Sequence, residues 1–165
     1  MIRWPECYDP ANAPVHVRNE IDTRASADRV WAWLVRASLW PSWYPNSHDV
    51  RIGGGTAADL AAGARFTWRT FGVFLRSTVL EFEPPERIAW NALGPGVDAY
   101  HAWLITPTPE GSNVLTEETQ HGWLARTGSL LFPSRMSRFH QLWLELLGAS
   151  AEGGPPPRGP GAGRG

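Results

Sequence analysis

The sequence contains no lysine, and this absence excludes several kinds of enzyme. All fifteen basic residues are arginines. Pyridoxal-type enzymes and class I aldolases form a Schiff base with a lysine, so both mechanisms are excluded. Arginine keeps its charge at any ordinary pH and therefore cannot serve as a neutral base either.

Cysteine, net charge and long apolar runs are also scarce. Cys7 is the single cysteine, which excludes an internal disulfide and a cysteine-rich zinc site. The formal charge of −1 gives no general attraction to nucleic acid, because that attraction comes from summed positive charge. No apolar run reaches the ~20 residues of a membrane span, and the N-terminus lacks the apolar stretch of a signal peptide. We therefore expect a cytoplasmic protein with no integral membrane segment and no nucleic-acid partner.

Motifs for metals and cofactors are missing as well. The five histidines show neither HxxxH nor HxH spacing, which argues against a metal site. The run Gly53-Gly54-Gly55 is followed neither by the Lys-Ser/Thr of a phosphate loop nor by the dinucleotide-binding spacing. The sequence therefore predicts no metal and no cofactor.

Tryptophan, in contrast, is abundant. The chain has ten tryptophans, and aromatic residues make up 12% of it. Aromatic rings bury large areas and often line ligand pockets. Two interpretations follow for each tryptophan: a core built from bulky side chains, which we favour for any single one, or the wall of a pocket.

The composition divides the chain into three parts. Residues 1–13 contain two prolines and show no clear period, which indicates an irregular arm. Residues 152–165 contain six glycines and four prolines, a composition that buries too little apolar surface to order itself, so we expect a disordered tail. The folded unit is then 14–151, with no internal repeat.

Hydrophobic periodicity within this unit changes three times. Residues 15–22 alternate as a half-buried strand. A helix capped by Ser26 and a short turn between Pro41 and Pro45 follow. Further strands are predicted at 49–52, 65–69, 71–82, 87–93, 98–106 and 114–123. A long amphipathic helix then runs from Pro133 to about Ala151. The predicted fold class is α+β: about seven antiparallel strands in a curved sheet around a long C-terminal helix, with two short helices after the first strand.

This order of elements, with these residues, resembles the START-like superfamily, whose helix-grip fold is shared by polyketide cyclases, Bet v 1-like proteins and lipid-transfer domains. Within it, the chain looks most like the bacterial polyketide cyclase/dehydrase branch (SRPBCC). The matching stretches are IDTRASADRVW (21–31), WPSW (40–43), EFEPPERIAW (81–90), HAWL (101–104), VLTEE (114–118) and FHQLW (139–143). The resemblance implies a pocket between sheet and helix for a small hydrophobic molecule. It brings no transferable catalytic signature, and a fold of this kind hosts many functions.

Side-chain direction selects the candidate catalytic residues. On strand 98–106 both faces are apolar, so its direction is open; we favour the face of Trp103 as inward, which places His101 inside. If Val114 points inward on the last strand, Glu118 does too, next to His101. His140 lies in the apolar stripe of the long helix and should face the sheet.

These three residues are predicted as general acid and base for a cyclisation or dehydration. Burial is expected to raise the pKa of a cavity carboxyl and to lower that of a buried histidine. The alternatives remain open: His140 as a hydrogen-bonded core residue, and Glu118 as an outward, solvated one. The remaining predicted ligand-binding residues are Asn19, Phe66, Trp68, Trp90, Tyr100, Trp103, Met136, Phe139 and Trp143, with Tyr100 facing inward only if its strand is reversed.

Three functions fit these features. The first is a carrier or sensor that binds a small hydrophobic, aromatic or polyketide-like molecule, as a monomer or homodimer. The second is a cofactor-independent cyclase or dehydrase. The third is a partner-binding or stress-related module that uses the turns at 40–45 as a surface patch. Arg126, Arg135 and Arg138 suggest either an anion site at the pocket mouth or, as we favour, a solvated helix face.

Overall fold

One antiparallel sheet of seven strands forms the body of the molecule, in the order β1-β7-β6-β5-β4-β3-β2. The computed structural model describes residues 1–53 and 59–157. The strands are β1 (Val15–Thr23), β2 (His48–Ile52), β3 (Arg65–Thr70), β4 (Val73–Glu83), β5 (Arg87–Gly94), β6 (Val97–Thr108) and β7 (Gly111–His121). From β2 to β7, each strand pairs with the next strand along the chain. The first strand, β1, pairs with β7 and forms the other edge of the sheet.

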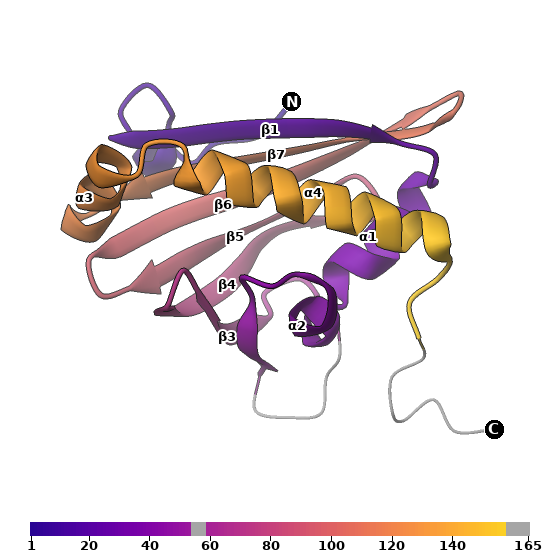
Figure 1. Ribbon diagram of the computed structural model, residues 1–165, viewed down its shortest axis with the longest axis horizontal. Helices are drawn as coiled ribbons and strands as arrows, with labels where there is room; N and C mark the ends of the chain where they lie inside the picture. Colours follow the sequence, from indigo (N-terminus) through magenta and orange to yellow (C-terminus); the bar gives the residue numbers. More distant parts are fainter. Residues whose placement is uncertain (54–58, 158–165) are drawn as a thin grey trace.

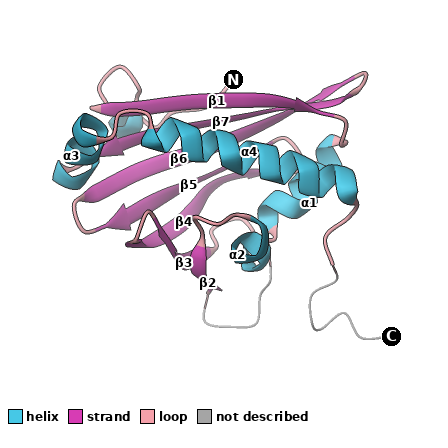
Figure 2. Cartoon of the chain, in the orientation of Figure 1, coloured by secondary structure: helices cyan, strands magenta, loops and turns pink. Residues whose placement is uncertain are grey.

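The α-helices gather on one face of this sheet, as Figure 2 shows. The helical segments are η1 (Glu6–Tyr8), α1 (Ala27–Val35), η2 (Ala37–Leu39), α2 (Trp40–Trp43), α3 (Trp123–Leu131) and α4 (Arg135–Gly153). The long helix α4 runs along β1, with α3 at one end and α1 at the other (Figure 1). This is the α+β helix-grip arrangement that the sequence predicts. Among the described residues, no helix is both long and apolar enough to cross a membrane.

An aromatic cluster fills one half of the space between sheet and helix. Trp40 is fully buried and its ring lies 5.2 to 5.6 Å from the rings of Trp68, Trp90 and Trp143. Tyr44 stacks on Trp143 with ring centroids 4.5 Å apart. Edge-to-face and stacked pairs of this kind add to the stabilisation from buried area. Within the turns at 40–45, Trp40 and Tyr44 therefore belong to the core, whereas Pro41, Ser42 and Pro45 are exposed. A surface patch there, as the third predicted function requires, would lack these two rings.

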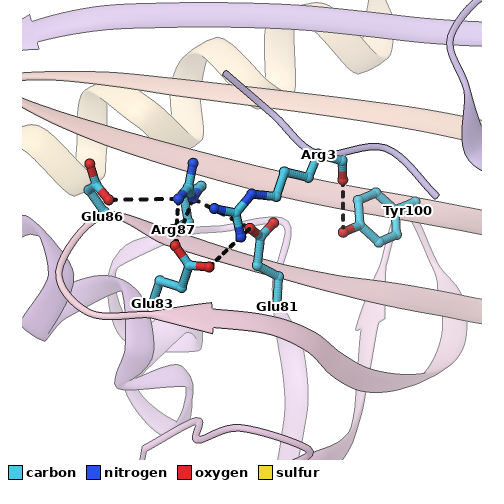
Figure 3. Close-up of polar contacts among 6 residues, drawn as sticks. All are labelled: Arg3, Glu81, Glu83, Glu86, Arg87 and Tyr100. Carbon is cyan, nitrogen blue, oxygen red and sulfur yellow. Dashed lines mark hydrogen bonds and ion pairs between the residues drawn. The ribbon is translucent and has the colours of Figure 1, made fainter.

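The N-terminal arm covers part of the opposite face of the sheet. Ile2 and Tyr100 are both buried there, and Trp4 and Tyr8 pack against them. Arg3 lies between Glu81 and Glu83, close to Arg87, and its backbone oxygen accepts a hydrogen bond from Tyr100 (Figure 3). Because the arm buries this face, β6 is apolar on both sides, which explains why its direction was ambiguous in the sequence.

Several boundaries differ from the prediction. The last strand ends at His121, and α3 follows where no helix was expected. The predicted strand 71–82 begins instead at Val73, because Phe71 and Gly72, both with positive φ, turn the chain between β3 and β4.

The C-terminal boundary also lies later than predicted. Helix α4 continues to Gly153, and the indole of Trp33 donates a hydrogen bond to the Gly154 oxygen. The first part of the expected disordered tail is therefore held against α1. Residues 158–165 of that tail, and residues 54–58 with part of the triglycine run, lie outside the described residues.

Candidate functional site

A cavity of about 190 Å³ lies between the sheet, α3 and the first half of α4. Its walls are mainly apolar, with a polar group formed by His101, Glu118 and His140. The aromatic cluster borders it through Trp68 and Trp143. The cavity therefore occupies the half of the helix grip that the tryptophans leave free.

Strand register brings the polar group together. His101 on β6 lies directly opposite Glu118 on β7, and Glu118 lies opposite Val17 on β1. Directly paired residues share a face of the sheet, and this face is the one that α4 covers. His140 reaches the same point from α4. The inward direction of Trp103, favoured from the sequence, is the one observed, since Trp103 is 1% exposed and contacts the ring of Trp143.

One carboxylate oxygen of Glu118 lies within hydrogen-bond distance of both histidines. Oε2 of Glu118 lies 3.1 Å from Nδ1 of His101 and 3.2 Å from Nε2 of His140. Its other oxygen accepts a hydrogen bond of 2.5 Å from the Gln120 amide. The three central side chains are at most 10% exposed. A carboxylate with this many donors is well compensated for the loss of water.

The donors decide the charge of Glu118. Burial by itself raises the pKa of this carboxyl, but the close contact with His101 and the hydrogen bonds from His140 and Gln120 outweigh burial and hold its pKa well below the usual range. The raised pKa expected for this carboxyl from burial alone is therefore wrong. Glu118 is therefore a carboxylate at neutral pH.

Burial has the expected effect on His101. It lowers the pKa of the imidazole to about 3, against the attraction of Glu118. A neutral His101 that donates from Nδ1 to Glu118 has an acceptor at Nε2. The Thr116 hydroxyl lies 2.8 Å from that atom and 3.2 Å from the Ala102 oxygen. Both ring nitrogens of His101 therefore have a polar neighbour within the protein.

His140 differs from His101, because one of its ring nitrogens has no hydrogen-bond partner among the described residues. In the neutral form of His140, with Nε2 donating to Glu118, Nδ1 is an acceptor. This atom is buried and has no hydrogen-bond partner among the described residues. The indole nitrogen of Trp143 is in the same state. Both residues line the cavity, and unpaired buried polar atoms of this kind call for a partner.

His101, Glu118 and His140 also carry the donor atoms of a possible metal site. Their donor atoms lie within 4.8 Å of one another, and two histidines with a carboxylate suit several divalent metals. However, the rings of His101 and His140 are stacked, with planes 10° apart and centroids separated by 4.8 Å. An ion lies close to the plane of each imidazole that binds it, so both rings would have to rotate. The arrangement fits a hydrogen-bonded group better than a metal centre.

The predicted ligand-binding residues divide into two groups. Trp68, Met136 and Trp143 line the cavity. The other six lie elsewhere. Phe66, Trp90 and Trp103 belong to the aromatic core, and Phe139 packs against Phe71. Asn19 donates a 3.0 Å hydrogen bond to Gln141. Tyr100 lies on the opposite face under the N-terminal arm, so it cannot reach the cavity.

Other lining residues were missed by the sequence argument. Tyr44, Phe71, Gln120 and Phe132 all border the cavity. Gln120 follows Glu118 at the strand period of two, so its position on the inner face was available from the sequence. Tyr44, Phe71 and Phe132 lie in or beside turns, where periodicity gives no direction.

Arg135 spans one edge of the cavity. Its guanidinium carbon lies 5.3 Å from the ring centre of Phe71 and 5.8 Å from that of Phe132. Both distances are within the range of cation–π attraction. Arg135 thus links the turn between β3 and β4 to the segment between α3 and α4.

Comparison with protein families gives a match over most of the chain. The family model described as polyketide cyclase/dehydrase and lipid transport matches residues 14–152. No match is found among the curated proteins.

Solved structures share the fold. The hypothetical protein jhp0584 from Helicobacter pylori is 30% identical, with a TM-score of 0.85 over 92% of this chain and 96% of that one. The di-domain ARO/CYC StfQ from the steffimycin biosynthetic pathway is 18% identical, with a TM-score of 0.69 over 84% of this chain and 51% of that one, so this chain spans about half of it. A truncated norcoclaurine synthase from Thalictrum flavum is 14% identical, with a TM-score of 0.62 over 81% of this chain and 91% of that one. The last two show the fold alone.

Proposed function

Because the chain belongs to the polyketide cyclase/dehydrase and lipid transport family, we propose that its cavity binds a small aromatic molecule that carries a hydroxyl group. In this proposal, the protein is a carrier or sensor of that molecule. The observation that carries it is the buried, unpartnered Nδ1 of His140, a residue that lines a mainly apolar cavity. An apolar ring would fill the space, and a hydroxyl would donate to this nitrogen.

The size of the cavity limits the ligand. An apolar cavity of about 150 Å³ accepts benzene, and the present cavity measures about 190 Å³. A single aromatic ring or two fused rings fit this volume. A longer polyketide chain would require α3 or the Arg135 contact to move.

The charge state of Glu118 supports binding over acid–base chemistry by this residue. A general acid or base works best with a pKa near the operating pH, and the pKa of Glu118 is lowered well away from it. Its role in the proposal is to fix the tautomer of His140 so that Nδ1 accepts. It is therefore a positioning residue.

Two matched probes test the proposal. 1-Naphthol and naphthalene differ by one hydroxyl, and binding of each is followed by tryptophan fluorescence and calorimetry. We expect 1-naphthol to bind about tenfold more tightly, as one net hydrogen bond allows. In His140→Phe this preference should disappear while naphthalene still binds.

The control is His48→Gln, because His48 is exposed on β2 and should leave both affinities unchanged. Equal affinities for the two probes in the native protein would refute the polar anchor. If neither probe bound at all, the ligand-binding function itself would be refuted.

A second candidate is a cyclase-like activity, favoured by the same nitrogen, because a free Nδ1 is also a proton acceptor. The terminal methyl carbon next to one carbonyl of heptane-2,6-dione would lose a proton to Nδ1 and attack the other carbonyl. The resulting alkoxide would recover that proton, and loss of water would give 3-methylcyclohex-2-enone. Appearance of this enone at a rate that falls to background in His140→Phe, but not in His48→Gln, would establish an enzyme; background rates in all three proteins would leave the carrier function.

A further inference from the structure

We propose that α3 and the segment joining it to α4 dock on the surface of an anionic lipid bilayer. This inference extends the proposed function, since a membrane would be the reservoir of an apolar ligand. Its test needs no ligand, so the two can fail separately.

Helix α3 turns large apolar side chains toward solvent. Trp123 is 68% exposed, Leu130 82%, Leu131 66% and Phe132 56%. The side of α3 that lines the cavity carries Leu124 and three small residues, Ala125, Gly128 and Ser129. A helix on the surface of a globular protein normally has its large apolar residues inward. Exposed apolar residues grouped in this way mark an interaction surface.

Along the chain, the charged residues near this surface are of one sign. From Thr119 to Leu144 the chain carries three arginines, Arg126, Arg135 and Arg138, and no aspartate or glutamate. All three arginines are exposed. None of them pairs with a carboxylate among the described residues. A chain of net charge −1 thus has a local excess of positive charge beside its exposed apolar helix.

A bilayer with anionic lipids satisfies both features. Its phosphates attract arginines, and its interfacial region takes tryptophan and aliphatic side chains from a helix lying in the surface. A second copy of the chain fits less well, because a symmetric contact through this surface would bring the arginines of both copies together.

The position of the surface relates it to the cavity. Phe132 and Arg135 belong to both, and Met136 follows directly on α4. Docking would therefore place the wall formed by α3 and the start of α4 against the lipid. A ligand dissolved in the membrane would meet the edge that Arg135 spans.

Vesicle sedimentation tests the proposal with the full chain. We compare vesicles of phosphatidylcholine with vesicles of equal parts phosphatidylcholine and phosphatidylglycerol. We expect binding to the anionic vesicles only, weakened by salt. Arg126→Gln should reduce the affinity about fivefold, the effect of one basic residue near an anionic surface. The double variant Leu130→Ser, Leu131→Ser should reduce it about tenfold or more, because two apolar side chains lose their burial.

The controls are Arg76→Gln and Leu80→Ser, which change exposed residues of β4 and should bind like the native chain. Circular dichroism checks that each variant is folded. Failure to bind anionic vesicles would overturn the proposal, as would equal losses in the controls. Self-association that disappears in the Leu130→Ser, Leu131→Ser variant, without vesicle binding, would assign the surface to a second copy instead. Unchanged 1-naphthol binding in that variant would show that the cavity is intact.

Discussion

Glu118 is the residue on which the polar end of the cavity depends. It is 8% exposed and lies within 3.2 Å of two imidazoles. An unpaired buried carboxylate is costly, so the three residues stabilise the fold only as a group. The electrostatics of the group have a direct consequence for stability against acid.

Stability should fall as the pH is lowered from about 6.5, the ordinary pKa of histidine in an unfolded chain. The pKa of His101 is about 3 in the folded protein, so between these values the unfolded chain binds a proton that the folded one does not, which favours unfolding. The lowered pKa of Glu118 acts in the same direction at lower pH. Melting temperatures measured across this range should decline less steeply for His101→Asn than for the native chain.

His48→Gln serves as the control for this experiment, since His48 is exposed and should leave the native slope unchanged. Parallel curves for His101→Asn and the native protein would contradict the assignment of a neutral, buried His101.

At the scale of elements, α3 is placed by backbone contacts rather than by a large apolar interface. Ala125 is its one buried residue, and Leu124 donates a backbone hydrogen bond to the Gly96 oxygen at 3.0 Å. Gly122 precedes the helix with φ of 104°, and a side chain there would lie 2.3 Å from the Gly96 oxygen. The close backbone contact between Gly122 and Gly96 thus fixes the start of the helix that closes the cavity.

Gly122→Ala should displace the start of α3 and destabilise the protein by about 2 kcal/mol, because both the positive φ and the backbone contact resist a Cβ. Urea unfolding measures the loss, and the affinity for 1-naphthol should weaken with it. Gly153→Ala is the matched control, since nothing lies within 4 Å of a Cβ added there. Equal stability of the two variants would show that α3 is not fixed at Gly122.

At the scale of the whole molecule, the aromatic cluster divides the helix grip into a packed half and an open half. Trp40 is central to the packed half: it contacts four other aromatic rings, and its indole nitrogen donates to the Leu34 oxygen at 3.0 Å. It connects the segment after α1 to the sheet and to α4.

Trp40→Ala should therefore lower the free energy of unfolding by about 3–5 kcal/mol, the usual range for removing a buried tryptophan. Trp123→Ala, a change of the same size at an exposed position, should change it by less than about 0.5 kcal/mol. Urea midpoints followed by circular dichroism compare the two. A small loss in Trp40→Ala would mean that the cluster closes over the missing ring.

Particular residues show which features of the site can be predicted from the sequence. The inward positions of His101, Glu118 and His140 followed from strand alternation, one favoured face and the helical stripe. Helix α3 did not follow, because its large apolar residues face solvent and produce a pattern opposite to that of a core helix. Tyr100 was misplaced for a related reason, since the N-terminal arm gives β6 a second apolar face.

The amino-acid sequence by itself determined the α+β class, the strand order along the chain, the long C-terminal helix and the absence of lysine chemistry, because local periodicity and composition fix these. Only the tertiary structure decided which aromatic residues border the cavity and which fill the core. It also decided that both imidazoles meet one carboxylate oxygen, which reverses the pKa shift expected from burial alone. Such outcomes depend on contacts between residues far apart in the chain, and one-dimensional patterns do not carry them.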